Sequence, residues 1–160
     1  MKTSRNSDSA GQIMQQHSRE TLLNVVPSAH TKIVANSYLR AQQLDWTWYE
    51  TLIALNENAT NSRRRARLMG LECALTLQDL AEIWIDQQGL CALTGQELAC
   101  SSGTPDQKNP YRASIDRIDN TQGYTRNNIR LVCHWANNAR STYSDSLFYS
   151  MCGSAVAYNK

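Results

Sequence analysis

The sequence predicts an α+β protein in which a two-stranded hairpin leads into a helix, with further helices on the N-terminal side. Residues 114–118 alternate polar and apolar side chains, as a half-buried strand does, and residues 129–133 form a second run of branched apolar residues. Turn-forming Asp, Asn and Gly residues lie between these two runs and favour a hairpin. Between residues 28 and 58, apolar side chains recur near every third or fourth position, which is helical spacing.

The composition permits one compact domain with extensions. The chain has 160 residues, of which 41% are hydrophobic, and this content is sufficient for one modest core. The formal net charge of +2 says little about a nucleic-acid partner, so local clusters of arginine are more informative. The sequence has no apolar run near transmembrane length and no hydrophobic signal segment at its N-terminus. We therefore expect a cytoplasmic protein with no membrane partner.

The first 60 residues divide into two segments. Residues 1–27 are polar and rich in Ser, Gln and Asn, without sustained periodicity, and this pattern predicts a disordered tail. The spacing in residues 28–60 predicts a helical extension of two helices with a break near Asp45. No motif in this region indicates a function.

A basic segment follows at residues 61–69. Its composition predicts a short helix that Gly70 ends at the usual C-terminal cap position. Guanidinium groups suit phosphate oxygens, and few acidic residues lie next to this segment, so we favour a DNA-backbone contact over a solvated face paired with local acids. The residues concerned are Arg63, Arg64, Arg65 and Arg67.

The clearest predicted helix begins at Thr76. Asp79 lies three residues on, which is the spacing of a capping box, and an apolar stripe that includes Leu80 and Trp84 follows. Gly89 ends this helix. The next residues, 91–111, predict a short knuckle-like segment and then a loop rich in Gly, Pro and Asn.

The hairpin segment resembles a known nuclease family. Its Ser-Ile-Asp-Arg-Ile-Asp series, followed by Gly-Tyr, an Asn and Leu-Val-Cys, is similar to the phage-type branch of the HNH endonucleases. The resemblance covers residues 61–152 and leaves residues 153–160 as a C-terminal tail. It implies a ββα-metal core, a hairpin plus helix that grips one divalent ion, and hydrolysis of DNA phosphodiesters. It also implies a phage-associated protein, located in the host cytoplasm if it is phage-encoded.

The resemblance assigns roles to three hairpin and helix residues. Asp116 corresponds to the carboxylate ligand of the metal and Asn137 to a second ligand through its amide oxygen, and such hard oxygen ligands suit Mg²⁺ or Mn²⁺. Asn138 creates a one-residue ambiguity, which the family spacing resolves in favour of Asn137. Asn128 corresponds to the middle Asn of the family name, whose side chain generally ties the loop together by hydrogen bonds.

The sequence departs from the family at Arg117. The family has a histidine there, which deprotonates the attacking water, whereas an arginine stays protonated and cannot act as that base. Three hypotheses remain open. Asp119 could accept the proton, His134 could accept it in its neutral form, or metal-bound hydroxide could attack while Arg117 steadies the phosphate.

Three further arginines flank the predicted site. Arg126, Arg130 and Arg140 are expected to contact the DNA backbone, although each alone could be an ordinary exposed charge.

The five cysteines do not complete a zinc site. In HNH relatives with a structural zinc, each knuckle supplies two cysteines. Here each knuckle has one, Cys91 or Cys133, and Thr94 and Ala136 stand where the second cysteine would be. Further ligands would have to be Cys100 and His134. We expect reduced, mostly buried thiols and no structural zinc.

The favoured function is a magnesium-dependent DNA endonuclease that nicks or cuts double-stranded DNA. The alternative is a catalytically degenerate HNH module that binds DNA or a protein, and the missing histidine motivates it. A host-directed inhibitor that uses the N-terminal helices is a third hypothesis, without direct support in the sequence. The sequence does not indicate a target site, a protein partner or an oligomeric state.

Overall fold

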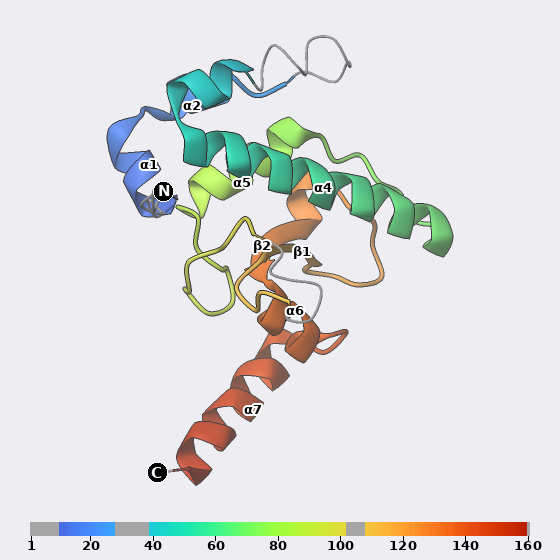
Figure 1. The fold of residues 1–160 in the computed structure, drawn as a ribbon. Coiled ribbons are helices and arrows are strands. Elements are labelled where there is room, and N and C mark those ends of the chain that lie inside the picture. The colour runs from blue at the N-terminus through green and yellow to red at the C-terminus, as the bar shows by residue number, and fades with distance from the viewer. Residues whose placement is uncertain (1–9, 28–38, 102–107, 160) are drawn as a thin grey trace.

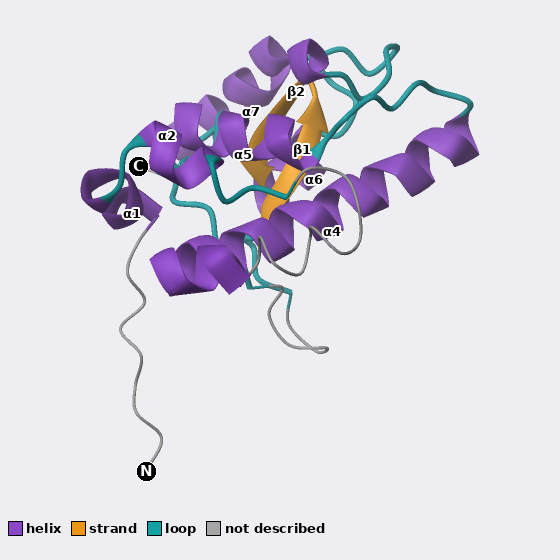
Figure 2. Cartoon of the chain, turned by 90° about the horizontal axis from the view of Figure 1, so that it is seen from above, coloured by secondary structure: helices purple, strands orange, loops and turns teal. Residues whose placement is uncertain are grey.

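The computed structural model describes residues 10–27, 39–101 and 108–159. A small antiparallel sheet of β1 (Ala113–Arg117) and β2 (Ile129–Cys133) is covered on one side by the long helix α4 (Trp46–Met69) (Figures 1 and 2). Further helices lie on the N-terminal and C-terminal sides of this pair. The α+β fold class that the sequence predicted is confirmed.

The N-terminal segment is folded where the structure describes it. Helices α1 (Ala10–Gln16) and α2 (Arg19–Leu23) pack against α4 and α5 respectively. Ile13 and Leu22 are fully buried, and the indole of Trp48 donates a hydrogen bond to the Leu22 carbonyl at 3.1 Å. The predicted disordered tail is therefore wrong for residues 10–27, because a few apolar side chains in a polar segment suffice to anchor it.

A break at Asp45 separates α4 from residues 39–44, which are also helical. The Asp45 carboxylate accepts hydrogen bonds from the backbone of Thr47 and Trp48 at 2.8 and 3.1 Å, so it caps the helix that follows. This break confirms the predicted division into two helices near Asp45. The part of the predicted extension at residues 28–38 lies outside the described residues.

The predicted basic helix at residues 61–69 is the last part of α4 rather than a separate element. No Gly or Pro interrupts residues 46–69, and the side chain of Asn58 bonds the carbonyls of Ala54 and Ala113 without breaking the helix. The boundary expected after residue 60 therefore falls inside α4. Gly70 ends α4 with φ +67°, which confirms the predicted cap.

Helix α5 (Leu77–Asp86) connects α4 to the hairpin. Thr76 and Asp79 form the predicted capping box. Beyond the end of α5, the Gln87 side chain exchanges two hydrogen bonds with the backbone of Leu131 in β2, at 2.8 and 2.9 Å. This pairing fixes α5 beside the sheet.

The C-terminal part contains α6 (His134–Arg140), which follows β2 directly, and α7 (Asp145–Tyr158). Helix α7 projects from the rest of the molecule (Figure 1). It continues to Tyr158, so the C-terminal tail predicted for residues 153–160 is wrong as far as the structure describes it. In the described part of the chain, no helix is long and apolar enough to span a membrane.

Candidate functional site

The hairpin and α6 bring the predicted site residues together. Asp116 of β1 lies opposite Arg130 of β2, and alternation along β1 places Ser114 and Asp116 on the same face of the sheet. Helix α6 covers this face, because Asn137 donates hydrogen bonds from Nδ2 to Ser114 Oγ at 2.7 Å and to the Ile115 carbonyl at 3.1 Å. A 3-10 turn, η1 (Arg126–Asn128), leads into β2.

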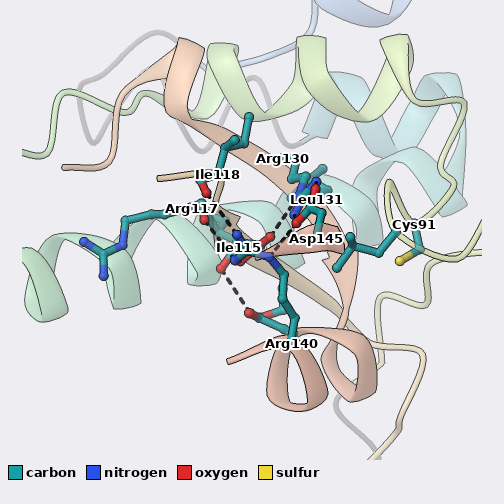
Figure 3. Close-up of polar contacts among 12 residues, drawn as sticks. Cys91, Ile115, Arg117, Ile118, Arg130, Leu131, Arg140 and Asp145 are labelled. Carbon is teal, nitrogen blue, oxygen red and sulfur yellow. Dashed lines mark hydrogen bonds and ion pairs between the residues drawn. The ribbon is translucent and has the colours of Figure 1, made fainter. Parts of the chain in front are cut away.

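Asp116 is held by two arginines. Its side chain is 2% exposed, Arg130 Nε donates to Oδ2 at 2.8 Å, and Arg140 Nη1 donates to Oδ1 at 2.9 Å. Both carboxylate oxygens are therefore engaged by guanidinium groups. Arg140 also donates to the carbonyls of Arg117 and Ile118 at 3.2 and 2.9 Å, which fixes its position at the end of β1 (Figure 3).

A second carboxylate completes a ring of four charges. Asp145 accepts two hydrogen bonds from Arg130 at 2.6 and 2.7 Å and one from Arg140 Nε at 2.7 Å (Figure 3). Two carboxylates and two guanidinium groups thus alternate around a closed ring, which we call the ion-pair ring (Asp116, Arg130, Asp145 and Arg140). Its formal charges balance.

The ring shifts the pKa of two of its members. Hydrogen bonds from Arg130 above all, and then from Arg140, lower the pKa of Asp145 to about 2 despite its partial burial. Burial disfavours the charge on Arg130, but the hydrogen bonds to Asp145 and Asp116 outweigh burial and raise its pKa. Asp145 and Arg130 therefore stay charged at neutral pH.

This arrangement does not fit the Mg²⁺ or Mn²⁺ ion that the family resemblance implies. A divalent cation at Asp116 would meet two guanidinium groups at the carboxylate that it needs. Asn137 turns its amide nitrogen toward β1, because the Ile115 carbonyl can only accept a hydrogen bond. Among the described residues, no group of three or more His, Cys, Asp or Glu side chains could hold a metal ion.

Arg117 and the first candidate for a replacement base, Asp119, have other partners. The Arg117 guanidinium donates to the Gln122 carbonyl at 2.8 Å and lies 5.0 Å from the centre of the Tyr124 ring, and it points away from the ion-pair ring (Figure 3). The Asp119 carboxylate closes a turn, since it accepts hydrogen bonds from Thr121 and from Gln122 Nε2. The bonds from Thr121 are the main cause of its lowered pKa, so Asp119 is a weak base.

His134 is paired within its own helix. Its Nε2 lies 3.1 Å from the amide nitrogen of Asn138, which must donate, so Nε2 accepts. Burial, followed by the nearby charges of Arg112 and Lys108, lowers the His134 pKa. The imidazole is therefore neutral at neutral pH, and it faces Asn138 rather than the ion-pair ring.

Asn128 closes the hairpin loop. Its Oδ1 accepts from the Asp119 amide at 2.9 Å, and its Nδ2 donates to the carbonyls of Asp119 and Gly123 at 3.0 and 2.9 Å. These bonds confirm the loop-tying role that was expected of this residue.

The predicted DNA-contact arginines fall into two groups. Arg126 pairs with Asp86 at 3.0 Å, and Arg130 and Arg140 belong to the ion-pair ring. By contrast, within the described chain no carboxylate lies within ion-pair distance of the arginines near the end of α4. That group, the α4 arginines, consists of Arg63, Arg64, Arg65 and Arg67, and all except the half-buried Arg65 are exposed.

The knuckle cysteines lie together on another side of the hairpin. The Cys133 amide donates to Cys91 Sγ at 3.2 Å, and the Thr94 hydroxyl lies 4.0 Å from Cys133 Sγ. Cys100 pairs instead with the Thr51 hydroxyl at 3.3 Å, so it does not join this pair. All five cysteines are free thiols.

Sequence reasoning missed Asp145. It lies at the first position of α7 after the cap Ser144, where an acidic residue is expected for helix capping alone. Its contacts with Arg130 and Arg140 depend on how α6 and α7 pack, so no local pattern indicated them.

No known family model, curated protein or solved structure matches this chain.

Proposed function

We propose that this protein binds DNA through the α4 arginines, on an HNH-type ββα scaffold in which the ion-pair ring has replaced the metal site, and that it does not cleave DNA. The observation that carries this proposal is the double engagement of Asp116 by Arg130 and Arg140. A carboxylate that serves as the anion of two guanidinium groups is a structural element rather than a vacant metal ligand.

The charge distribution supports DNA as the partner. Arg126, Arg130 and Arg140 are neutralised by Asp86, Asp116 or Asp145. The α4 arginines, by contrast, extend over slightly more than one helical turn without an ion-pair partner among the described residues. Exposed guanidinium groups on one helix end can bind successive phosphates and release counterions. The resemblance of the hairpin to DNA-processing nucleases supports the same partner.

The test compares two sets of arginine variants by the salt dependence of binding to a short DNA duplex. Alanine at Arg63, Arg64 and Arg67 is expected to weaken binding and to reduce the slope of log K against log[salt] by up to about 0.9 for each phosphate that is no longer neutralised. Arg126→Ala is the matched control, since Arg126 is paired with Asp86, and it should leave the slope nearly unchanged. An unchanged slope in the triple variant would remove α4 from the interface.

The second candidate function is the metal-dependent DNA endonuclease. One observation favours it: Asp145 gives both Arg130 and Arg140 a second carboxylate, so Asp116 could leave the ring without stranding either arginine. Asp116 and the amide oxygen of Asn137 would then be the protein ligands, and the ion would stabilise charge on the phosphate. A phage-associated protein in the host cytoplasm is compatible with both functions, and we propose that location on the family resemblance alone.

A further inference from the structure

Helix α7 exposes an unusual amount of apolar surface. It has no charged residue from Ser146 to Tyr158, yet Phe148 is its only buried residue. Met151 is 63% exposed, Val156 59% and Tyr158 91%. A helix that is apolar on every side is normally buried, and a contiguous apolar patch of this kind on a protein surface usually marks a binding site.

An apolar groove of about 720 Å³ lies along α7 on the side of α6. Trp135 and Tyr143 form one wall, and Leu147, Met151 and Val156 lie along the helix. The Trp135 ring packs edge-to-face on the buried Phe148, with 6.4 Å between ring centres, which fixes the groove floor. The groove thus has an aromatic floor that joins α6 to α7.

The same helix carries a ridge beside the groove. Leu147, Met151, Ser154 and Tyr158 recur at intervals of four, three and four residues, which is the heptad spacing of helices that pack in pairs. Leu147 and Met151 also line the groove, so the ridge forms one edge of the groove and continues past it to Tyr158. In a two-fold arrangement the ridge of each copy can therefore enter the groove of the other, as an isologous contact requires.

The chemistry of the surface argues against two other occupants. DNA needs cations, and neither the ridge nor the groove lining contains Lys or Arg. A membrane-surface helix also carries Lys or Arg on its polar face, and α7 has neither between residues 145 and 158. Two identical uncharged surfaces, by contrast, meet without like-charge repulsion.

The exposed area is sufficient for a stable pair. Six large side chains contribute most of it, and together they offer on the order of 700 Å² per copy, close to the roughly 800 Å² per partner of a standard interface. They are Trp135, Tyr143, Leu147, Met151, Val156 and Tyr158. We propose that α7 and its groove form the dimer interface of this protein, with a second copy of the chain as the occupant.

The test is sedimentation equilibrium of the full chain over a range of concentrations. The wild-type protein is expected to show twice the mass of one chain. Met151→Glu should raise the dimer dissociation constant at least about tenfold, because it would bury a charge in an apolar contact. Ala157→Glu is the matched control. It adds the same charge to an exposed residue of α7 that does not line the groove, so it should leave the constant within about twofold.

Circular dichroism checks that each variant is folded. If Met151→Glu does not fold, Tyr158→Glu at the exposed end of the ridge replaces it, with the same expected dissociation. A wild-type protein that is monomeric at every concentration overturns the proposal. It is also overturned if the folded ridge variant dimerises as tightly as the wild type, or if Ala157→Glu dissociates the dimer equally. None of these outcomes depends on DNA binding or cleavage.

Discussion

Asp116 is a buried carboxylate whose two oxygens each meet a guanidinium group. Burying a charge is costly unless it is paired, so removing one member of such a set leaves its neighbours less fully compensated. The ion-pair ring therefore explains why a strand of the hairpin can carry an aspartate at 2% exposure. In this account Asp116 stabilises the fold, whereas the family resemblance assigned it to a metal.

Asp116→Ala should lower the free energy of unfolding by up to about 3–5 kcal/mol, because Arg130 and Arg140 would keep only the partly exposed Asp145 as their carboxylate. Urea denaturation measures the change. Asp86→Ala is the matched control, since Asp86 is half exposed and forms only surface pairs, and it should cost no more than about 1 kcal/mol. Equal losses in the two variants would contradict a structural role for Asp116.

The depressed pKa of Asp145 predicts a pH dependence of stability. Its pKa is about 2 in the folded protein against the ordinary 3.8, so its contribution is fully present above pH 3.8 and is lost as the pH falls towards 2. Asp145→Asn should therefore flatten the stability profile in that window. The lowered pKa of Asp119 contributes to the pH dependence in the wild type and in the Asp145→Asn variant alike, so it does not alter the comparison. Identical profiles measured by denaturation would show that Asp145 is not paired in solution.

At the level of elements, the hairpin loop depends on one side chain. Asn128→Ala would leave the Asp119 amide and two loop carbonyls without partners, and it should cost about 2–3 kcal/mol of unfolding free energy. The neighbouring Asn127 is exposed, so Asn127→Ala should stay within about 0.5 kcal/mol. If the two variants prove equally stable by thermal and urea denaturation, the loop is not held by Asn128.

Elements with a strong local signal could be predicted from the sequence. The capping box of Thr76, the left-handed Gly70 and the break at Asp45 each depend on residues within one helical turn. The hairpin was predicted because strand alternation and turn residues agree. The lengths of α4 and α7 were not predicted. Asn residues near position 60 suggested a helix boundary inside α4, and the end of the chain suggested a tail where α7 continues, because the packing around both segments is not visible in the sequence.

The candidate site shows the same limit. The family resemblance assigned Asp116, Asn128 and Asn137 to one hairpin and the helix after it, and the structure places them there. The sequence could not indicate that Arg140 pairs with Asp116. These residues lie 24 positions apart, and they meet only because α6 folds back on β1. The arginines that resembled DNA contacts therefore proved to be partly structural.

On the scale of the whole molecule, the proposed functional surfaces lie on different elements. The α4 arginines lie near the C-terminal end of one long helix, and the apolar ridge lies on α7, which projects from the rest of the molecule (Figure 1). The ion-pair ring takes one residue from each of β1, β2, α6 and α7, and so it joins these four elements. In this arrangement DNA binding and dimerisation can be altered independently by substitution.

The most direct test of the central claim is incubation of the purified protein with supercoiled plasmid in Mg²⁺, Mn²⁺ or EDTA, with DNA binding measured in the same samples. We expect DNA binding that does not require the metal ion and persists in EDTA, and no nicking in any of the three conditions, because Asp116 is committed to two arginines. Metal-dependent nicking that is lost in folded Asp116→Asn and Asn137→Ala variants would contradict it. Both residues would then be metal ligands, and the protein would be the endonuclease that its hairpin resembles.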